Sequence, residues 1–239
     1  MNLPYCGPLP TAWSPTFRMR SLYRSLMAAS LLSFSLAVSA SAQTAAEKQL
    51  SRIDFSLNGI GSFSHAVTGP VLPKYAANTG QQLTVLPSNT FGAMATFRYV
   101  ARPYVGFEFN YAFARYTENY DTPGPVAAPG GIQTTANEYT LGYLVTPAHP
   151  VFGMQPFVSA GTGSLEFKPT AGGGQELPHQ ARQVYYYNVG LDDSFDSRFG
   201  VRGGFRQTFY LAPDFGQNYL TVLKHTWTAE PYIGFYVKF

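Results

Sequence analysis

The sequence predicts an all-β fold, an eight-stranded antiparallel up-and-down transmembrane β-barrel. Three observations lead to it: apolar and polar side chains alternate from residue 52 to the end, long and short connections alternate, and the aromatic face of each clear strand carries no charge in its middle. Alternation with a period of two is typical of strands and is not produced by a helix. An apolar face without charge is what a strand in hydrocarbon requires.

Composition excludes several classes of protein. The chain is 16% aromatic and only 12% charged, which is unusual for a soluble enzyme. It has 16 Lys and Arg against 13 Asp and Glu, but three basic and no acidic residues precede position 43, so the remainder has 13 of each. A formally neutral remainder gives no support to nucleic-acid binding. Cys6 is the only cysteine, and no apolar run of about 18 residues follows position 42, so we expect neither disulfides nor a helical membrane protein.

The first 42 residues have the order of a secretory signal. A basic region precedes the short apolar stretch 26–38, and Ala40 and Ala42 form an A-x-A cleavage site. The alternative, a first transmembrane or buried helix, is disfavoured because the stretch is short and rich in serine. Residues 1–18 contain four prolines and would make the signal unusually long, so we expect translation to start at Met19. We therefore predict a signal peptide over 1–42, a short lead over 43–51 and a barrel over 52–239.

Five strands are predicted from clear alternation, over residues 53–64, 90–99, 104–114, 138–145 and 199–209. In 104–114 one face consists of Val105, Phe107, Phe109, Tyr111 and Phe113. Three more strands are predicted over 155–167, which is small and Gly-rich, and over 183–192 and 227–239. The total is eight, as in the smallest transmembrane barrels.

The connections between these strands differ in length in a regular way. Segments 65–88, 117–134, 168–182 and 211–223 are long, whereas 100–103, 147–150 and 193–197 are short. Bacterial outer-membrane barrels have this asymmetry, with long outer loops, short periplasmic turns and both termini in the periplasm. A β-sandwich, with its Greek-key crossovers, would not show it.

The polarity of the two strand faces distinguishes a membrane barrel from a lipocalin-like soluble barrel, whose apolar residues point inward. The nonaromatic face mixes small residues with a few charges of both signs, which suits a crowded lumen better than a solvated surface. Glu108 and Arg202 are expected near one depth, and Glu138 and Arg206 near a second. An eight-stranded barrel is barely wide enough for its own side chains, and isolated charges there are costly. We predict a lumen plugged by paired charges, with partners that depend on strand stagger.

The last strand ends in an apolar face formed by Ile233, Phe235, Val237 and the terminal Phe239. This ending resembles the C-terminal signal that the barrel-assembly machinery reads in outer-membrane barrels. We therefore expect that machinery, periplasmic chaperones, outer-membrane lipid and lipopolysaccharide to be the partners of a monomeric protein.

Short motifs resemble one family. Residues 156–163, Pro-Phe-Val-Ser-Ala-Gly-Thr-Gly, resemble a strand of the outer membrane protein β-barrel domain family, the small OmpA- and OmpX-like barrels. Gly190-Leu-Asp192, followed by residues 197–202 and Arg206, is similar to the next hairpin of that family. The resemblance covers about residues 50–239 and implies an eight-stranded barrel in the bacterial outer membrane. Its motifs are short and tolerant, so they imply no particular function.

The sequence indicates a structural or surface-interacting outer-membrane barrel without catalytic activity or cofactor. One alternative is a narrow porin-like channel for ions or small solutes. A second is a lipid-modifying hydrolase or acyltransferase at the outer rim, where Ser64 and His65 could meet Lys224 and His225, with Glu230 as the nearest acid. His149 and His179 show no metal-ligand spacing, so we expect no metal site.

Overall fold

The computed structural model describes residues 49–122 and 130–239. The predicted signal, with Met19, Ala40 and Ala42, lies outside the described residues. Within the described ranges no helix is long and apolar enough to cross a membrane.

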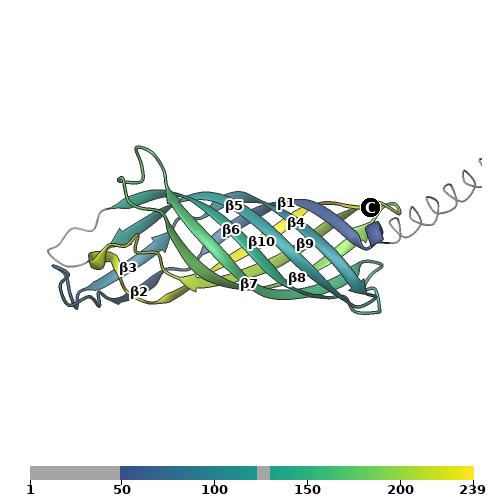
Figure 1. Cartoon of the computed structure of the whole chain (residues 1–239), viewed down its shortest axis with the longest axis horizontal. Coiled ribbons are helices and arrows are strands. Elements are labelled where there is room, and N and C mark those ends of the chain that lie inside the picture. The colour runs from purple at the N-terminus through teal and green to yellow at the C-terminus, as the bar shows by residue number, and fades with distance from the viewer. Residues whose placement is uncertain (1–48, 123–129) are drawn as a thin grey trace, which may run out of the picture. The chain divides into compact units, whose positions relative to one another are not determined.

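Eight long strands form a closed antiparallel barrel, which confirms the predicted fold class (Figure 1). They are β1 (Ile53–Ser64), β4 (Thr90–Arg102), β5 (Val105–Asp121), β6 (Gly131–Val145), β7 (Gln155–Pro169), β8 (Gln180–Ser194), β9 (Phe199–Leu211) and β10 (His225–Lys238). The shorter elements are β2 (Val67–Pro70), β3 (Gln82–Pro87) and the 3-10 turn η1 (Asn218–Leu220). β10 pairs back with β1 and β5 pairs with β6, so the ladder has no open edge between long strands.

The two ends of the barrel differ. The short connections and the C-terminus lie at one end, the turn end, and β2 and β3 lie at the other, the loop end (Figure 1). The connection after β6 is longer than the predicted turn 147–150, because a bridge between Val151 and Met154 forms before β7 starts at Gln155. The predicted loop 65–88 contains the hairpin β2–β3, and β3 extends the sheet by pairing with β5.

The strands run further toward the loop end than the alternation predicts. Residues 117–134 were expected to be a loop, yet β5 continues to Asp121 and β6 starts at Gly131. The reason is an inversion of polarity: Tyr116, Tyr120 and Ile132 are buried inside the barrel, while their outward neighbours are polar. An apolar interior with a polar exterior is the pattern of a strand in water, so these segments project beyond the lipid.

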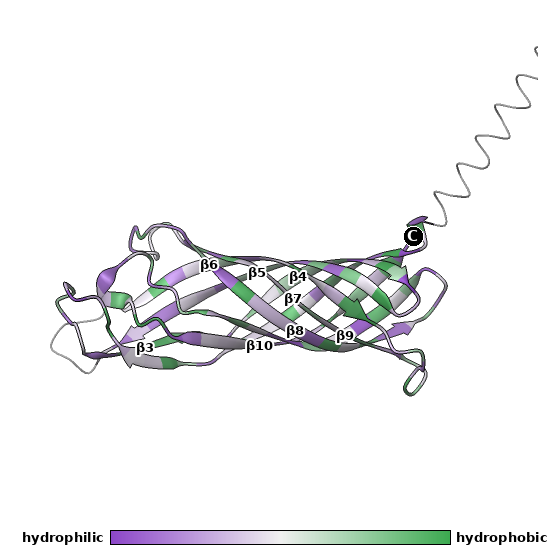
Figure 2. Cartoon of the chain, turned by 60° about the horizontal axis from the view of Figure 1, so that its bottom comes forward, coloured by the Kyte–Doolittle hydropathy of each residue, from purple (hydrophilic) through white to green (hydrophobic). Residues whose placement is uncertain are grey.

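Closer to the turn end, hydrophobic and hydrophilic residues alternate along the strands (Figure 2), and the hydrophobic ones are exposed on the outer face while the polar ones are buried inside. On β5, Phe107 and Phe109 are 41% and 43% exposed, whereas Glu108 between them is fully buried at 0%. The outward residues of β5 stay apolar over positions 105–113, a length that fits the 9–11 residues of a membrane-crossing strand. This polarity is the reverse of a lipocalin-like barrel and excludes that alternative.

Candidate functional site: the lumen

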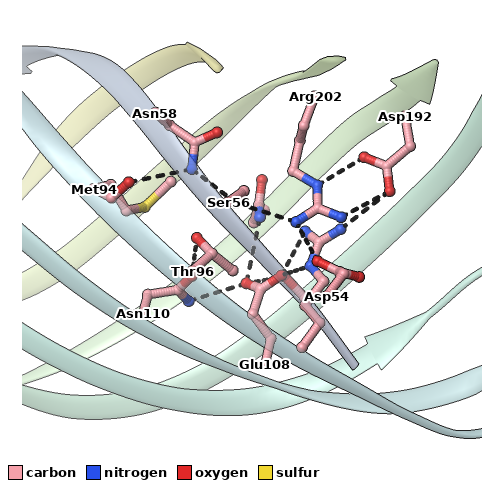
Figure 3. A network of polar contacts seen from close by, with 12 residues as sticks. Asp54, Ser56, Asn58, Met94, Thr96, Glu108, Asn110, Asp192 and Arg202 are labelled. Carbon is pink, nitrogen blue, oxygen red and sulfur yellow. Dashed lines mark hydrogen bonds and ion pairs between the residues drawn. The ribbon is translucent and has the colours of Figure 1, made fainter. Parts of the chain in front are cut away.

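Near the turn end, a first cluster of buried charges spans the lumen (Figure 3). The register places Arg98 opposite both Asp54 on β1 and Glu108 on β5. The Arg98 guanidinium lies 2.5 Å from Glu108 Oε2, and Arg202 Nη1 lies 2.9 Å from Asp54 Oδ1. Arg202 Nε also donates to Asp192 Oδ1 over 2.7 Å. Two arginines and three carboxylates therefore lock five strands together (β1, β4, β5, β8 and β9), and we call this set the lower charge cluster.

Neutral side chains satisfy the remaining oxygen of Glu108. Asn110 Nδ2 donates to Glu108 Oε1 over 3.0 Å, and the Ser159 hydroxyl donates to the same oxygen over 2.9 Å. Thr96 in turn donates to Asn110 Oδ1 over 2.8 Å, which fixes the orientation of the amide. The Arg98 guanidinium also stacks 3.9 Å from the Phe157 ring centre. Satisfied polar groups of this kind hold a buried network in one arrangement.

A second cluster lies closer to the loop end. Arg206 forms ion pairs with Glu138 and with Glu230, the latter over 2.6 Å, and all three side chains are buried. Its Nη2 also donates to the Thr140 hydroxyl over 3.1 Å, and its guanidinium stacks 4.6 Å from the Tyr186 ring centre. This upper charge cluster connects β6, β9 and β10 across the barrel.

The four charged residues singled out in the sequence all point into the lumen. Arg206 and Glu138 meet, but Glu108 pairs with Arg98 and not with Arg202. The alternation also placed Asp54, Arg98 and Asp192 on the lumen face, but it did not assign them to a charge pair, and it did not predict the pairing of Glu230. The short turn between β4 and β5 could have revealed the Arg98–Glu108 pair by counting residues from it on both strands. The same count across the short β8–β9 turn could have revealed the Asp192–Arg202 pair. Asp54 lies on β1, two strands from β9, so its pairing with Arg202 depends on the stagger around the barrel.

A small cavity lies above the upper charge cluster. Its volume is about 30 Å³, and polar residues from several strands line it, among them Ser62, Tyr116, Tyr210 and Glu230. A space of this size holds about one or two water molecules.

Toward the loop end, apolar side chains fill the barrel and form a cluster that we call the outer cap. The segment between β9 and β10 folds inward, so that Phe215 and Leu220 are 0% and 1% exposed. Phe215 has a φ of 48°, and Gly216 follows with a φ of 70°. The outer cap comprises mainly Val71, Leu83, Val85, Tyr116, Tyr120, Ile132, Leu165, Phe167, Val184, Tyr210, Phe215, Leu220 and Val222.

Asp214 anchors this inward segment. Its carboxylate accepts a hydrogen bond from Gln180 Nε2 over 2.5 Å and from the Gly216 N–H over 3.0 Å, and it pairs with Arg182 over 2.9 Å. Burial acts to raise the pKa of Asp214, but these hydrogen bonds and the Arg182 charge outweigh it, so its pKa lies below the ordinary value. Residues 209–215 thus lead the chain from β9 into the outer cap.

Glu118 is the exception within the outer cap. It is 0% exposed, and neither carboxylate oxygen accepts a hydrogen bond in the described structure. The phenol of Tyr116 is a neighbouring donor, but its position does not give a hydrogen bond of normal geometry. Glu118 was not expected inside the barrel, because the sequence pattern predicts a loop over residues 117–134.

The terminal residues proposed as an assembly signal lie on the outer face. Ile233, Phe235 and Phe239 are 67%, 71% and 57% exposed, and Val237 is partly exposed. The Phe239 N–H donates to the Ile53 carbonyl over 3.2 Å, so the end of the chain is held against β1.

The residues of the hypothetical rim hydrolase do not assemble into a site. The Ser64 hydroxyl bonds Thr228 over 3.0 Å, whereas His65 stacks on Trp227 outside the barrel with ring centres 4.9 Å apart. Glu230 is inside and paired with Arg206. No group of three or more metal-ligating side chains occurs in residues 49–122 and 130–239.

Comparison with known proteins relates the fold to membrane barrels. No family model and no curated protein sequence matches the chain. Among solved structures, the outer membrane protein OprG from Pseudomonas aeruginosa is similar with a TM-score of 0.52 and 14% identity, covering 78% of this chain and 95% of that chain. Neisserial surface protein A has a TM-score of 0.49 and 12% identity, covering 77% of this chain and 97% of that chain.

The closed ladder, the apolar outer band and the likeness to OprG define an outer-membrane β-barrel. Its fold is that of a small eight-stranded barrel like OprG, as the sequence motifs implied. A chain of this class resides in the bacterial outer membrane.

Proposed function

We propose that this protein is a structural or surface-interacting outer-membrane barrel that does not conduct solutes. The proposal rests on one observation: three obstacles block the lumen one after another. The lower charge cluster, the upper charge cluster and the outer cap follow one another from the turn end to the loop end. A solute would have to break buried ion pairs at two depths, and each break leaves an uncompensated charge.

The loop end supports a role at the cell surface. The strands and the β2–β3 hairpin extend beyond the apolar band, and the Asp214 contacts hold the β9–β10 connection in place. The described part of this projecting end presents a surface to other molecules. The geometry of the rim residues gives no support to the hydrolase alternative.

The proposal includes delivery of the protein to the membrane by the assembly machinery. The exposed terminal face of Ile233, Phe235, Val237 and Phe239 is available for recognition by the assembly machinery before insertion. The protein would then act as a monomer, because the lumen is filled by its own side chains and needs no second copy to close it.

A liposome-swelling assay tests the closed lumen. The full-length protein, refolded into vesicles, should give no swelling in small sugars or amino acids above that of empty vesicles, while a general porin in the same lipid serves as the positive control. A variant with residues 213–222 replaced by a short Gly-Ser linker should also give none, because both charge clusters remain. Rapid swelling with the unmodified protein would contradict the proposal and favour the channel alternative.

A further inference from the structure

The upper charge cluster contains more carboxylates than arginines. Glu138 and Glu230 both pair with Arg206, the latter over 2.6 Å, and all three side chains are buried. One guanidinium against two carboxylates leaves one excess negative charge. A buried charge without a counter-charge is unfavourable, so such a group is neutralised by a proton or binds a metal ion. The upper charge cluster therefore needs one further positive charge.

The rest of the lumen does not supply that charge. In the lower charge cluster two arginines face three carboxylates, so this level also has an excess of negative charge. Toward the loop end, Glu118 adds a buried carboxylate in the outer cap. Arg98, Arg202 and Arg206 are the only basic side chains among the buried residues of the described ranges. The counter-charge of the upper charge cluster therefore comes from the solvent, as a proton or as an ion.

The small cavity borders the two carboxylates of the upper charge cluster. Glu138 and Glu230 both line it, whereas Arg206 does not. Each carboxylate uses one oxygen for Arg206, and no hydrogen bond of its second oxygen occurs in the part of the chain that the structure describes. The volume of about 30 Å³ gives room for one small ion in place of a water molecule.

Hydroxyl groups complete the polar lining of the cavity. The hydroxyls of Tyr210 and Thr228 share a hydrogen bond of 3.2 Å. Ser62 and Thr208 are 4% and 1% exposed, and within residues 49–122 and 130–239 no hydrogen bond involves either hydroxyl. A buried hydroxyl without a partner is unfavourable, so these two groups point to a ligand in the cavity. The lining offers carboxylate and hydroxyl oxygens and no basic group, which is the set of ligands that hard cations prefer.

We propose that this cavity binds one monovalent alkali cation, Na⁺ or K⁺, through the two carboxylates of the upper charge cluster and the hydroxyls of Ser62 and Thr208. A single positive charge makes the cluster formally neutral, whereas a divalent ion would leave an excess positive charge beside Arg206. The ligands come from β1, β6, β9 and β10, so the ion joins strands on both sides of the β1–β10 closure.

Urea unfolding at constant ionic strength measures this binding. The full-length protein is refolded in detergent and unfolded in sodium chloride, potassium chloride or N-methylglucamine chloride at one total chloride concentration. N-methylglucamine is too large for the cavity, so it reports the effect of ionic strength alone. When Na⁺ or K⁺ replaces it, the folding equilibrium constant should rise and saturate, by about tenfold at a concentration ten times the dissociation constant. The ion with the lower half-saturating concentration is the preferred one.

Variants test where the cation binds. Glu230→Gln removes the excess charge and should abolish the difference between the cations, while its amide oxygen can still accept a hydrogen bond from Arg206. Glu118→Gln is the matched control, because it removes a buried lumen carboxylate that does not line the cavity, and it should preserve the difference. The double variant Ser62→Ala with Thr208→Val removes two oxygen ligands and should raise the half-saturating concentration. Gel mobility with and without boiling verifies folding of each variant.

Equal unfolding midpoints of the unmodified protein in the three chlorides would overturn the proposal, because a proton would then supply the positive charge. A cation effect that persists in Glu230→Gln, or that is also lost in Glu118→Gln, would overturn it too. The same holds for an unchanged half-saturating concentration in the double variant. None of these outcomes bears on the closed lumen, which the swelling assay tests separately.

Discussion

The effect of a buried charged side chain on the free energy of unfolding depends on whether it has an ion-pair or hydrogen-bond partner. Arg98 and Glu108 are 2% and 0% exposed and contact each other directly. We expect Glu108→Ala to lower the free energy of unfolding by about 3–5 kcal/mol, because Arg98 would remain buried without its main partner. Urea unfolding in detergent measures it. The double variant Arg98→Met with Glu108→Leu should be less destabilised than Glu108→Ala, and the opposite order would contradict this account of the pair.

Glu118 should behave in the opposite way. Its carboxylate is buried in the outer cap and accepts no hydrogen bond in the described structure. Glu118→Leu removes that cost and should raise the free energy of unfolding by about 1–3 kcal/mol. Glu138→Leu is the matched control: it should destabilise, because Glu138 is paired with Arg206. If both variants destabilise in the same unfolding assay, Glu118 has a partner that this account lacks.

Asp214 makes the outer cap sensitive to acid. Its pKa is lowered in the folded protein, so its contribution to stability is fully present above the unfolded value of about 3.9 and is lost as the pH falls through the folded value. Hydrogen exchange in residues 212–224 should therefore accelerate, relative to the intrinsic rate, below about pH 4. Asp214→Asn should remove that pH step. A step that persists in Asp214→Asn would assign the effect to another group.

At the scale of single strands, the outward face should tolerate charge only beyond the lipid. Phe109 and Asn119 both point outward from β5, but Phe109 lies in the apolar band and Asn119 outside it. Phe109→Arg should destabilise the barrel by about 2–4 kcal/mol, whereas Asn119→Arg should be nearly neutral. Unfolding from lipid vesicles compares the two. Similar losses for both would show that the apolar band is misplaced.

The last strand should also be needed for delivery. Removal of Phe239 should leave the protein in the periplasm, because the proposed assembly signal is incomplete, while refolding of the purified variant in detergent stays close to that of the parent. Fractionation of cells and gel mobility provide the two measurements. A comparable loss of membrane delivery and of refolding would indicate that Phe239 only stabilises the barrel through a lipid-facing contact.

The sequence predicted the strands well where one face meets lipid, because apolar and polar residues then alternate in a single sense. The prediction failed from Tyr116 to Tyr120, where apolar side chains point inward and polar ones point outward. A strand facing lipid has the opposite arrangement, so an inward tyrosine beside an outward threonine was interpreted as part of a loop. The inward direction of Glu108 and Arg202 followed from alternation alone. Their cross-strand partners Arg98 and Asp192 could have been found by counting residues from the short turns. Asp54 could not, because it lies two strands from Arg202 and that stagger is set by closure of the whole barrel.

For the molecule as a whole, eight strands closed by the β1–β10 pairing leave an interior filled along its length by two charge clusters and an apolar cap. A groove beside Pro231 indents the lipid-facing surface. The interior is thus filled by the protein's own side chains, and contacts with other molecules are left to the outer surface. The central claim is that nothing of solute size passes through it.

Planar-bilayer recording of the refolded full-length protein tests that claim most directly. With a known porin as the control in the same membrane, the unmodified protein should insert without stable conductance steps of porin size. The combined variant Arg98→Ala, Glu108→Ala, Arg206→Ala without residues 213–222 should show openings if it still folds by gel mobility, because all three obstacles are then weakened. Steady, large single-channel steps from the unmodified protein would contradict the closed lumen.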